Sequence, residues 1–331
     1  MKVVAVGGGT GLSTLLRGLK NYPCEITAVV TITDEGGSSG ILREELNVPP
    51  PGDIRNNLVA LASSENILGA LFNYRFKDGS LSGHTVGNII LAALTKLTGS
   101  FAEAVANACD ILAIKGRVLP VSLKMARLLA VFEDGKRIIG ETNIVEYAKK
   151  SNKKISELAL EESVEINPDV QKALMESDAI IFGPGSLYTS VIANLVVDGF
   201  AKNVKEARAV KIYVSNIMTQ PGETNGYTLS EHIKEVERYV DSKLDYIIHS
   251  FPPNNPEVLQ KYELKGSHAV SVDLEDERLI LGHFSSIAYE NDYRIRHDPI
   301  LLSEVIYNLL STKAEKNFSG KTGIKQSEVT M

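Results

Sequence analysis

Cysteine and tryptophan are scarce in this chain. Its 331 residues contain two cysteines and no tryptophan, and the two cysteines, Cys24 and Cys109, form no C-x-x-C pair. Such sparse cysteine usage predicts neither a disulfide framework nor a thiolate zinc site. We therefore expect a protein of the reducing cytoplasm.

Long apolar runs and dense basic segments are also missing. No apolar run approaches the roughly 20 residues needed to span a bilayer, and glycines interrupt the first apolar stretch at Gly7, so we expect neither a membrane span nor a signal peptide. The formal net charge is -6, and no stretch concentrates lysine and arginine. This charge pattern argues against binding of a nucleic-acid backbone.

The chain does contain an ordinary share of core-forming residues, arranged in alternating strand and helix patterns. Hydrophobic residues make up 44% and charged residues 23%, which is typical of a folded soluble protein. Residues 2–6 predict a strand, the glycines at 7–11 a tight turn, the leucines within 12–19 a helix, and residues 26–32 a second strand. This βαβ opening predicts a mainly parallel α/β sheet that binds its ligand at the carboxyl ends of the strands.

A β-rich insertion is expected in the middle of the chain, at about residues 117–165. Residues 128–132 and 138–139 have strand-like patterns, and Asp134-Gly135 between them is typical of a hairpin turn. The insertion would interrupt the α/β pattern without forming part of the parallel sheet.

The rest of the chain predicts α/β structure that ends in a polar tail. Strand and helix patterns alternate again after the insertion, and a last helix is expected at 301–310. We therefore predict one α/β domain over residues 1–311, followed by a mobile polar tail at 312–331. Nearer the start, residues 34–52 lose all periodicity and predict a long functional loop.

Two glycine-rich turns are candidate phosphate-binding loops. At Gly7–Gly11 the missing side chains let backbone N–H groups approach an anion, and the N-terminus of the next helix adds partial positive charge. The second, Gly183–Ser190, combines glycines with hydroxyl groups after a predicted strand. A tight turn that needs glycine for its dihedral angles is the alternative for the first, and a simple N-cap at Ser186 for the second. The first loop is not a Walker A loop, and it departs from the dinucleotide fingerprint because Leu12 stands where that motif has its third glycine. The second loop does not have the spacing of a nucleophile elbow.

Acidic, amide and hydroxyl groups accompany these loops. Asp34 follows the second strand and could bind a ribose or base, ligate Mg²⁺ or cap the next turn. Asp53 is placed as a helix N-cap, whereas His84 is a lone histidine, which is usually solvated or structural. Amides and hydroxyls at 216–224 can recognise a sugar or base. Arg296 offers either a diphosphate clamp or a surface salt bridge.

Several of these segments, in the same order, resemble one known family. The segments are VVAVGGGTGLSTLLRGLK, TDEGGSSGILREEL, PPPGDIRNNLVALA, GHTVGNIILAALT, GPGSLYTSVIANL, SNIMTQPGETNGYTLSEHI and RHDP. Together they are similar, from Met1 to about Leu310, to the gluconeogenesis factor family, whose fold resembles that of the 2-phospho-L-lactate transferases. The resemblance implies a three-layer α/β/α Rossmann-like fold and a cytoplasmic regulator that binds a UDP-sugar, UDP-N-acetylglucosamine or UDP-glucose. It also implies roles in growth on gluconeogenic carbon sources, cell shape and cell-wall precursor supply.

Residue patterns and the resemblance together give a set of expected ligand contacts, none of them with a catalytic role. The expected contacts are Gly8, Gly9, Thr10, Gly11, Asp34, Gly37, Ser38, Ser39, Arg43, Asp53, Asn57, His84, Asn88, Gly183, Gly185, Ser186, Tyr188, Thr189, Ser190, Asn216, Thr219 and Arg296. Glu35 departs from the Asp-Asp or Asp-Asn that relatives commonly carry, so we transfer no metal role to it.

Other functions stay open at this point. The main alternative is a Mg²⁺-dependent phospho-transferase of the 2-phospho-L-lactate transferase type, and a nicotinamide dehydrogenase is a weaker one. A homo-oligomer is compatible with the sequence, which indicates no particular protein partner.

Overall fold

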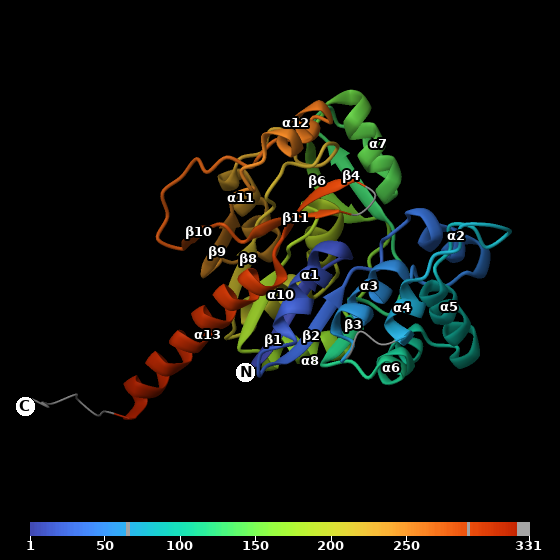
Figure 1. The fold of residues 1–331 in the computed structure, drawn as a ribbon, viewed down its shortest axis with the longest axis horizontal. Helices are drawn as coiled ribbons and strands as arrows, with labels where there is room; N and C mark the ends of the chain where they lie inside the picture. Colours follow the sequence, from blue (N-terminus) through green and yellow to red (C-terminus); the bar gives the residue numbers. More distant parts are fainter. Residues whose placement is uncertain (64–66, 290–291, 323–331) are drawn as a thin grey trace, which may run out of the picture.

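A seven-stranded sheet forms the centre of the protein (Figure 1). The computed structural model describes residues 1–63, 67–289 and 292–322. The strand order is β10-β9-β8-β7-β1-β2-β3, and every neighbouring pair runs parallel. The strands are β1 (Lys2–Gly7), β2 (Glu25–Val30), β3 (Arg117–Pro120), β7 (Ala179–Phe182), β8 (Val210–Val214), β9 (Tyr246–Ser250) and β10 (Leu279–Gly282). The predicted parallel α/β architecture is confirmed.

Helices cover both faces of this sheet, so its central strands are apolar on both sides. On β1, Val3 and Ala5 pack into one core cluster while Val4 and Val6 pack into another. The first face is covered by α1 (Thr10–Leu19), α3 (Gly52–Leu61), α6 (Phe101–Leu112) and α13 (Pro299–Thr322). The second is covered by α8 (Pro168–Glu176), the π-helix η1 (Leu187–Ile192), α9 (Ala193–Leu195), α10 (Phe200–Glu206) and α11 (Leu229–Val240). The fold therefore has the three predicted layers.

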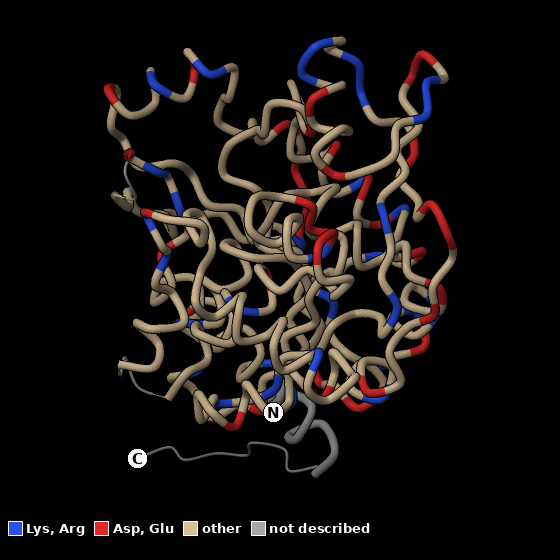
Figure 2. The backbone as a smooth tube through the Cα atoms, turned by 90° about the vertical axis from the view of Figure 1, so that its right-hand side faces the viewer, with Lys and Arg blue, Asp and Glu red and all other residues tan. Residues whose placement is uncertain are grey.

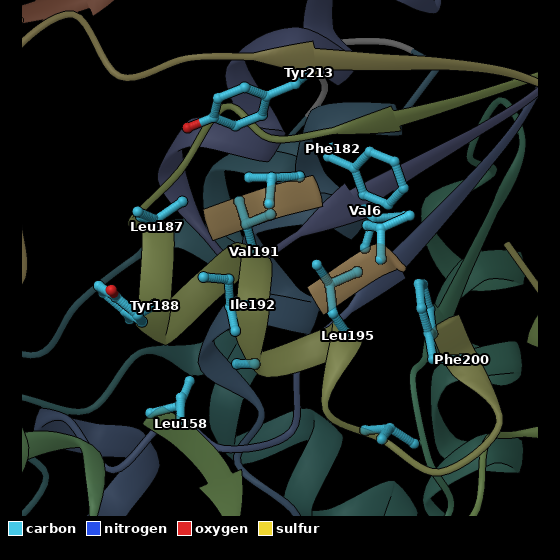
Figure 3. Close-up of a cluster of buried hydrophobic side chains, with 14 of the residues drawn as sticks. Val6, Leu158, Phe182, Leu187, Tyr188, Val191, Ile192, Leu195, Phe200 and Tyr213 are labelled. Atoms are coloured by element: carbon cyan, nitrogen blue, oxygen red, sulfur yellow. The ribbon is translucent and has the colours of Figure 1, made fainter. Parts of the chain in front are cut away.

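The second face illustrates how the layers join. Figure 3 shows Val6, Phe182 and Tyr213 of the sheet beside Val191 and Leu195 of the covering helices. All of these side chains are at most 3% exposed. This packing fixes η1 directly behind the end of β7, where the candidate site begins.

In the chain, a separate three-stranded sheet comes between β3 and β7 of the main sheet. It has the order β5-β4-β6, and its elements are β4 (Leu128–Phe132), β5 (Arg137–Ile139), α7 (Glu141–Ser151) and β6 (Ile155–Leu160). The predicted hairpin turn is present, with Gly135 at φ 81° between the antiparallel β4 and β5. β3 pairs with β2 in the main sheet, so the separate sheet starts at Leu128 and not at Arg117.

Three local predictions are wrong or incomplete. Residues 34–52 are not a continuous loop, because α2 (Gly37–Leu46) forms within them. Asp53 is not an N-cap, because α3 already begins at Gly52 and Pro51 occupies the cap position without a side-chain bond. The last helix continues to Thr322, and residues 323–331 of the predicted tail lie outside the described residues.

Three further helices and one antiparallel ribbon complete the described structure. They are α4 (Ile67–Asn73), α5 (Val86–Thr98), α12 (Pro256–Leu264) and an antiparallel ribbon of β11 (Ser285–Tyr289) and β12 (Tyr293–His297). Within the described residues, no helix is both long and apolar enough to cross a bilayer.

Candidate ligand-binding cleft

The main cleft lies where the chain order of the sheet reverses. From β1 the chain continues to β2 on one side, whereas β7 on the other side continues to β8. Open α/β sheets bind ligands at such a switch point, beyond the carboxyl ends of the strands. The loops after β1 and β7 both line a cleft of about 1110 Å³ at this position.

The first glycine loop is shaped by contact with its neighbours. A side chain at Gly8 would place its Cβ 2.6 Å from the Ser190 hydroxyl, and one at Gly11 would overlap the carbonyl oxygen of Pro184. These glycines are therefore required for the two loops to pack together. The same packing leaves Gly9, Thr10 and Gly11, at the start of α1, on the cleft wall.

The second loop is capped by a carboxylate from within the protein. Glu223 Oε2 accepts hydrogen bonds from the backbone N–H groups of Tyr188 (3.1 Å) and Thr189 (3.2 Å). Its Oε1 accepts from the Thr189 hydroxyl (3.0 Å) and from Gln220 Nε2 (2.8 Å). Burial raises the pKa of Glu223, and the hydrogen bonds from Thr189 and Tyr188 oppose the rise. Those two N–H groups of η1 are thus already hydrogen-bonded to a carboxylate.

Acidic side chains line one end of the cleft. Asp34, Asp53 and Glu141 all contribute to its wall. Burial, and then the nearby charge of Asp34, raise the pKa of Asp53 to about 8, and the same two causes raise the pKa of Glu141 to about 8. Glu141 also accepts the backbone N–H of Glu35 at 3.0 Å. At neutral pH, Asp53 and Glu141 are therefore mainly uncharged and can donate hydrogen bonds.

Basic and amide side chains also line the wall. Lys149 comes from α7, Arg294 and Arg296 from β12, and Lys265 from the segment after α12. Asn216, at the end of β8, donates to the Gly185 carbonyl at 2.9 Å and so joins two cleft loops. On the side of the chain seen in Figure 2, lysine and arginine alternate with acidic residues and form no continuous band. The positive charge of the cleft is thus local.

About half of the predicted contact residues line this cleft. They are Gly9, Thr10, Gly11, Asp34, Asp53, Gly185, Ser186, Thr189, Ser190, Asn216, Thr219 and Arg296. Asp34 also makes the turn contact considered as its alternative, since its Oδ1 accepts the Gly36 N–H at 2.8 Å.

Other predicted residues support the cleft from behind. Asn57 is fully buried and donates to the carbonyl of Gly8 at 2.7 Å. The Ser39 hydroxyl accepts the N–H of Gly52 at 3.0 Å. The buried Tyr188 hydroxyl bonds to that of Tyr227 at 2.9 Å. Gly8 and Gly183 belong to the two glycine loops without lining the cleft, and Gly37 begins α2 with a φ of 44°.

A third group of predicted residues lies elsewhere. Ser38, His84 and Asn88 gather between α2 and α5, and Arg43 donates to the Ala126 carbonyl at 2.9 Å. None of these four lines the main cleft. Glu35 bonds to Arg127 Nε at 2.8 Å and thereby ties its loop to the segment before β4.

Sequence reasoning did not single out Glu141, Lys149 or Glu223. Glu223 lies in the amide-rich segment already recognised, but no local pattern indicates that it caps a helix thirty-odd residues earlier in the chain. Glu141 and Lys149 lie on a helix of the small sheet, where only the tertiary fold brings them to the cleft.

A metal centre does not emerge from the acidic end. Within the described part of the chain, no group of three or more His, Cys, Asp or Glu side chains is arranged to hold a metal ion. We therefore derive no step that passes through Mg²⁺.

Known proteins share this architecture and sequence. The family model "2-phospho-L-lactate transferase CofD" matches residues 3–283. The gluconeogenesis factor of Bacillus subtilis is 41% identical over 314 residues, covering 93% of this chain and 98% of that protein. A Thermotoga maritima protein carries the same name provisionally and is 53% identical over 312 residues, covering 92% of this chain and 98% of its own.

A solved structure gives the same result for the fold. The crystal structure of a UPF0052 family protein from Bacillus halodurans superposes with a TM-score of 0.85 at 41% identity, covering 92% of this chain and 99% of that one. Sequence and structure thus agree over nearly the whole length. The chain belongs to the gluconeogenesis factor family, within the wider 2-phospho-L-lactate transferase family.

Proposed function

We propose that this protein is a cytoplasmic regulator that binds a UDP-sugar in the main cleft. The observation that carries the proposal is the position of the cleft, at the switch point where the loops after β1 and β7 meet. Nucleotides bind at this position in related α/β architectures. The relatives named gluconeogenesis factor support a regulatory role in growth on gluconeogenic carbon sources. We extend the proposal to cell shape and cell-wall precursor supply.

The chemistry of the wall suits a diphosphate. The start of α1 offers backbone N–H groups at Thr10 and Gly11 and the positive end of a helix dipole. Arg296 and Lys149 add cations, and an arginine fork matches phosphate geometry. Because Asp53 and Glu141 are mainly protonated at neutral pH, they repel a diphosphate less than two carboxylates would.

The sugar and base require neutral hydrogen-bonding groups. Asn216, Thr219 and Gln220 line the same cleft beyond the second loop. Their amides and hydroxyl can both donate and accept, as sugar hydroxyls and a uracil ring require. We assign the sugar to this part of the wall.

Isothermal titration calorimetry of the full chain tests the proposal. UDP-N-acetylglucosamine and UDP-glucose should each give saturable binding heat, and Arg296→Gln should weaken affinity about tenfold through loss of a charge-assisted contact. Arg117→Gln is the matched control, since Arg117 is exposed and lies outside the main cleft. If neither UDP-sugar gives heat or stabilises the wild-type protein at millimolar concentration, the proposal fails.

Phospho-transfer is a second candidate, favoured by the family match over residues 3–283. An enzyme of this type would consume a nucleotide-linked phospho-donor when Mg²⁺ is present. Release of a nucleoside monophosphate from such a donor, suppressed by a metal chelator, would support this activity. Intact donor after prolonged incubation would leave binding as the better account.

A further inference from the structure

A buried arginine outside the main cleft lacks an acidic partner. Arg55, on α3, is 7% exposed, and its Nε has no hydrogen-bond partner. Its Nη2 donates to the neutral side chain of Asn56. Among the described residues, no carboxylate lies within ion-pairing distance of Arg55. A buried charge without a close counter-ion is costly, and a bound anion would relieve this cost.

A second guanidinium increases this excess of positive charge. Arg75, after α4, is exposed, forms no ion pair in the described part of the chain, and donates to the Gly83 carbonyl. Burial, and then the charge of Arg75, lower the pKa of Arg55 to about 10. Asp53 and Asp34 act in the opposite direction but less strongly. Arg55 thus has a second guanidinium nearby, and the acidic side chains around it are too distant for an ion pair among the described residues.

Polar side chains from two other helices meet beside Arg55. The Ser38 hydroxyl lies 3.0 Å from His84 Nδ1 and accepts from Asn88 Nδ2 at 3.1 Å. Asn88 is 3% exposed, and its Oδ1 is buried without a partner. A Cβ on Gly87 would lie 2.8 Å from Arg55 Cγ, so the arginine stem crosses the first turn of α5. Unpaired donor and acceptor groups therefore occur together at the start of this helix.

These residues connect to the main cleft through one side chain. Asn56, which accepts from Arg55, also approaches Gly9, since a Cβ there would lie 3.0 Å from Asn56 Nδ2. The cluster is therefore a neighbour of the cleft and shares none of the cleft-lining residues in its own donor set, which is Arg55, Arg75, Ser38 and His84. In Figure 1 the helices α2, α3, α4 and α5 that carry or flank it lie together on one side of the sheet.

We propose that Arg55, Arg75, Ser38 and His84 form a second site that binds a phosphate group. Two guanidinium groups from different segments can hold separate oxygens of a tetrahedral anion. Ser38 and His84, which share a hydrogen bond, supply one further donor, either the hydroxyl or the imidazole N–H according to the histidine tautomer. The unpaired Asn88 oxygen can accept the proton of a hydrogen phosphate. The site is separate from the UDP-sugar cleft and does not depend on it.

Inorganic phosphate is the first probe, titrated into the full chain by calorimetry at constant ionic strength. Arg75→Gln removes an exposed side chain and should leave the fold intact while weakening phosphate affinity about fivefold to tenfold. Arg117→Gln, which alters an exposed arginine outside both sites, should bind phosphate as the wild-type protein does. Arg55→Lys, which keeps the charge but loses the fork, should also weaken binding, and circular dichroism checks that it folds.

Two results would overturn the proposal. One is an unchanged phosphate affinity in Arg75→Gln, and the other is a loss in Arg296→Gln alone, which would place the anion in the main cleft. Glycerol 3-phosphate, with glycerol as control, identifies the source of the phosphate group. Competition by the ester indicates a phosphorylated metabolite, and its failure to compete indicates free phosphate.

Discussion

The structure gives Asp53 a different role from the one that its place in the sequence predicts. Its position before a helical pattern predicts an N-cap, but Gly52 already belongs to α3 and the Asp53 side chain lies against the first glycine loop. There, burial and the charge of Asp34 raise its pKa to about 8. A residue that would stabilise a helix by capping instead makes the stability of the cleft depend on pH.

Stability should therefore fall as pH rises through neutrality. The folded pKa of Asp53 lies above its unfolded value of 3.8, so the folded state holds more protons between these values and loses stability as pH rises from about 4 to about 8. Asp53→Asn, which stays neutral, should reduce the decline between about pH 5.5 and 8.5 by about 1 kcal/mol or more in urea unfolding.

Glu141 should retain the rest of this pH dependence, since its pKa is raised in the same direction. Asp110→Asn, which alters an exposed aspartate on α6, is the control and should leave the slope as in the wild type. An equal slope in Asp53→Asn and the wild type would show that Asp53 is not protonated in the folded cleft.

Individual cleft-lining residues were predictable where they lie in the loop after a strand. Asp34, Thr10 and Asn216 stand at strand ends, and parallel strands bring their carboxyl ends to one edge. Glu223 and Glu141 reach the same cleft from a distant loop and from the small sheet. Their positions depend on tertiary packing, which periodicity does not contain.

At the scale of elements, the strands were easier to predict than the short polar helix. Strands covered on both faces have continuous apolar runs, which identify β1, β2, β7 and β8. Helix α2 buries only Ser38, Ser39 and Leu42. Its sequence therefore lacks the apolar residues at 3.6-residue spacing that would predict a helix. Its first turn is held by contacts with another segment, since the Ser38 hydroxyl accepts from Asn88 of α5.

The contact between the two glycine loops should be sensitive to a single methyl group. Gly11→Ala would push against the Pro184 carbonyl, and such overpacking against backbone costs roughly 1–3 kcal/mol of unfolding free energy. Gly36→Ala is the control, because its Cβ would meet only the flexible Asp34 side chain at 3.3 Å. Equal urea midpoints for the two variants would show that the loops do not need this close approach.

At the scale of the whole molecule, the main sheet positions two groups of residues that we propose to bind anions, and these groups lie on either side of α3. The main cleft uses the strand ends on both sides of the β1 and β7 switch point, while the proposed phosphate site uses helices beside it. The parallel order and the family could be anticipated from the chain. The division of the predicted residues between two sites could not, because α5 approaches α2 only in the folded protein.

A crystal structure of the protein grown with UDP-N-acetylglucosamine tests the central proposal most directly. We predict the diphosphate within about 3 Å of backbone N–H groups at the start of α1 and of Arg296, with the sugar beside Asn216 and Thr219. A main cleft without nucleotide at saturating ligand concentration, or a nucleotide bound elsewhere on the molecule, would contradict it.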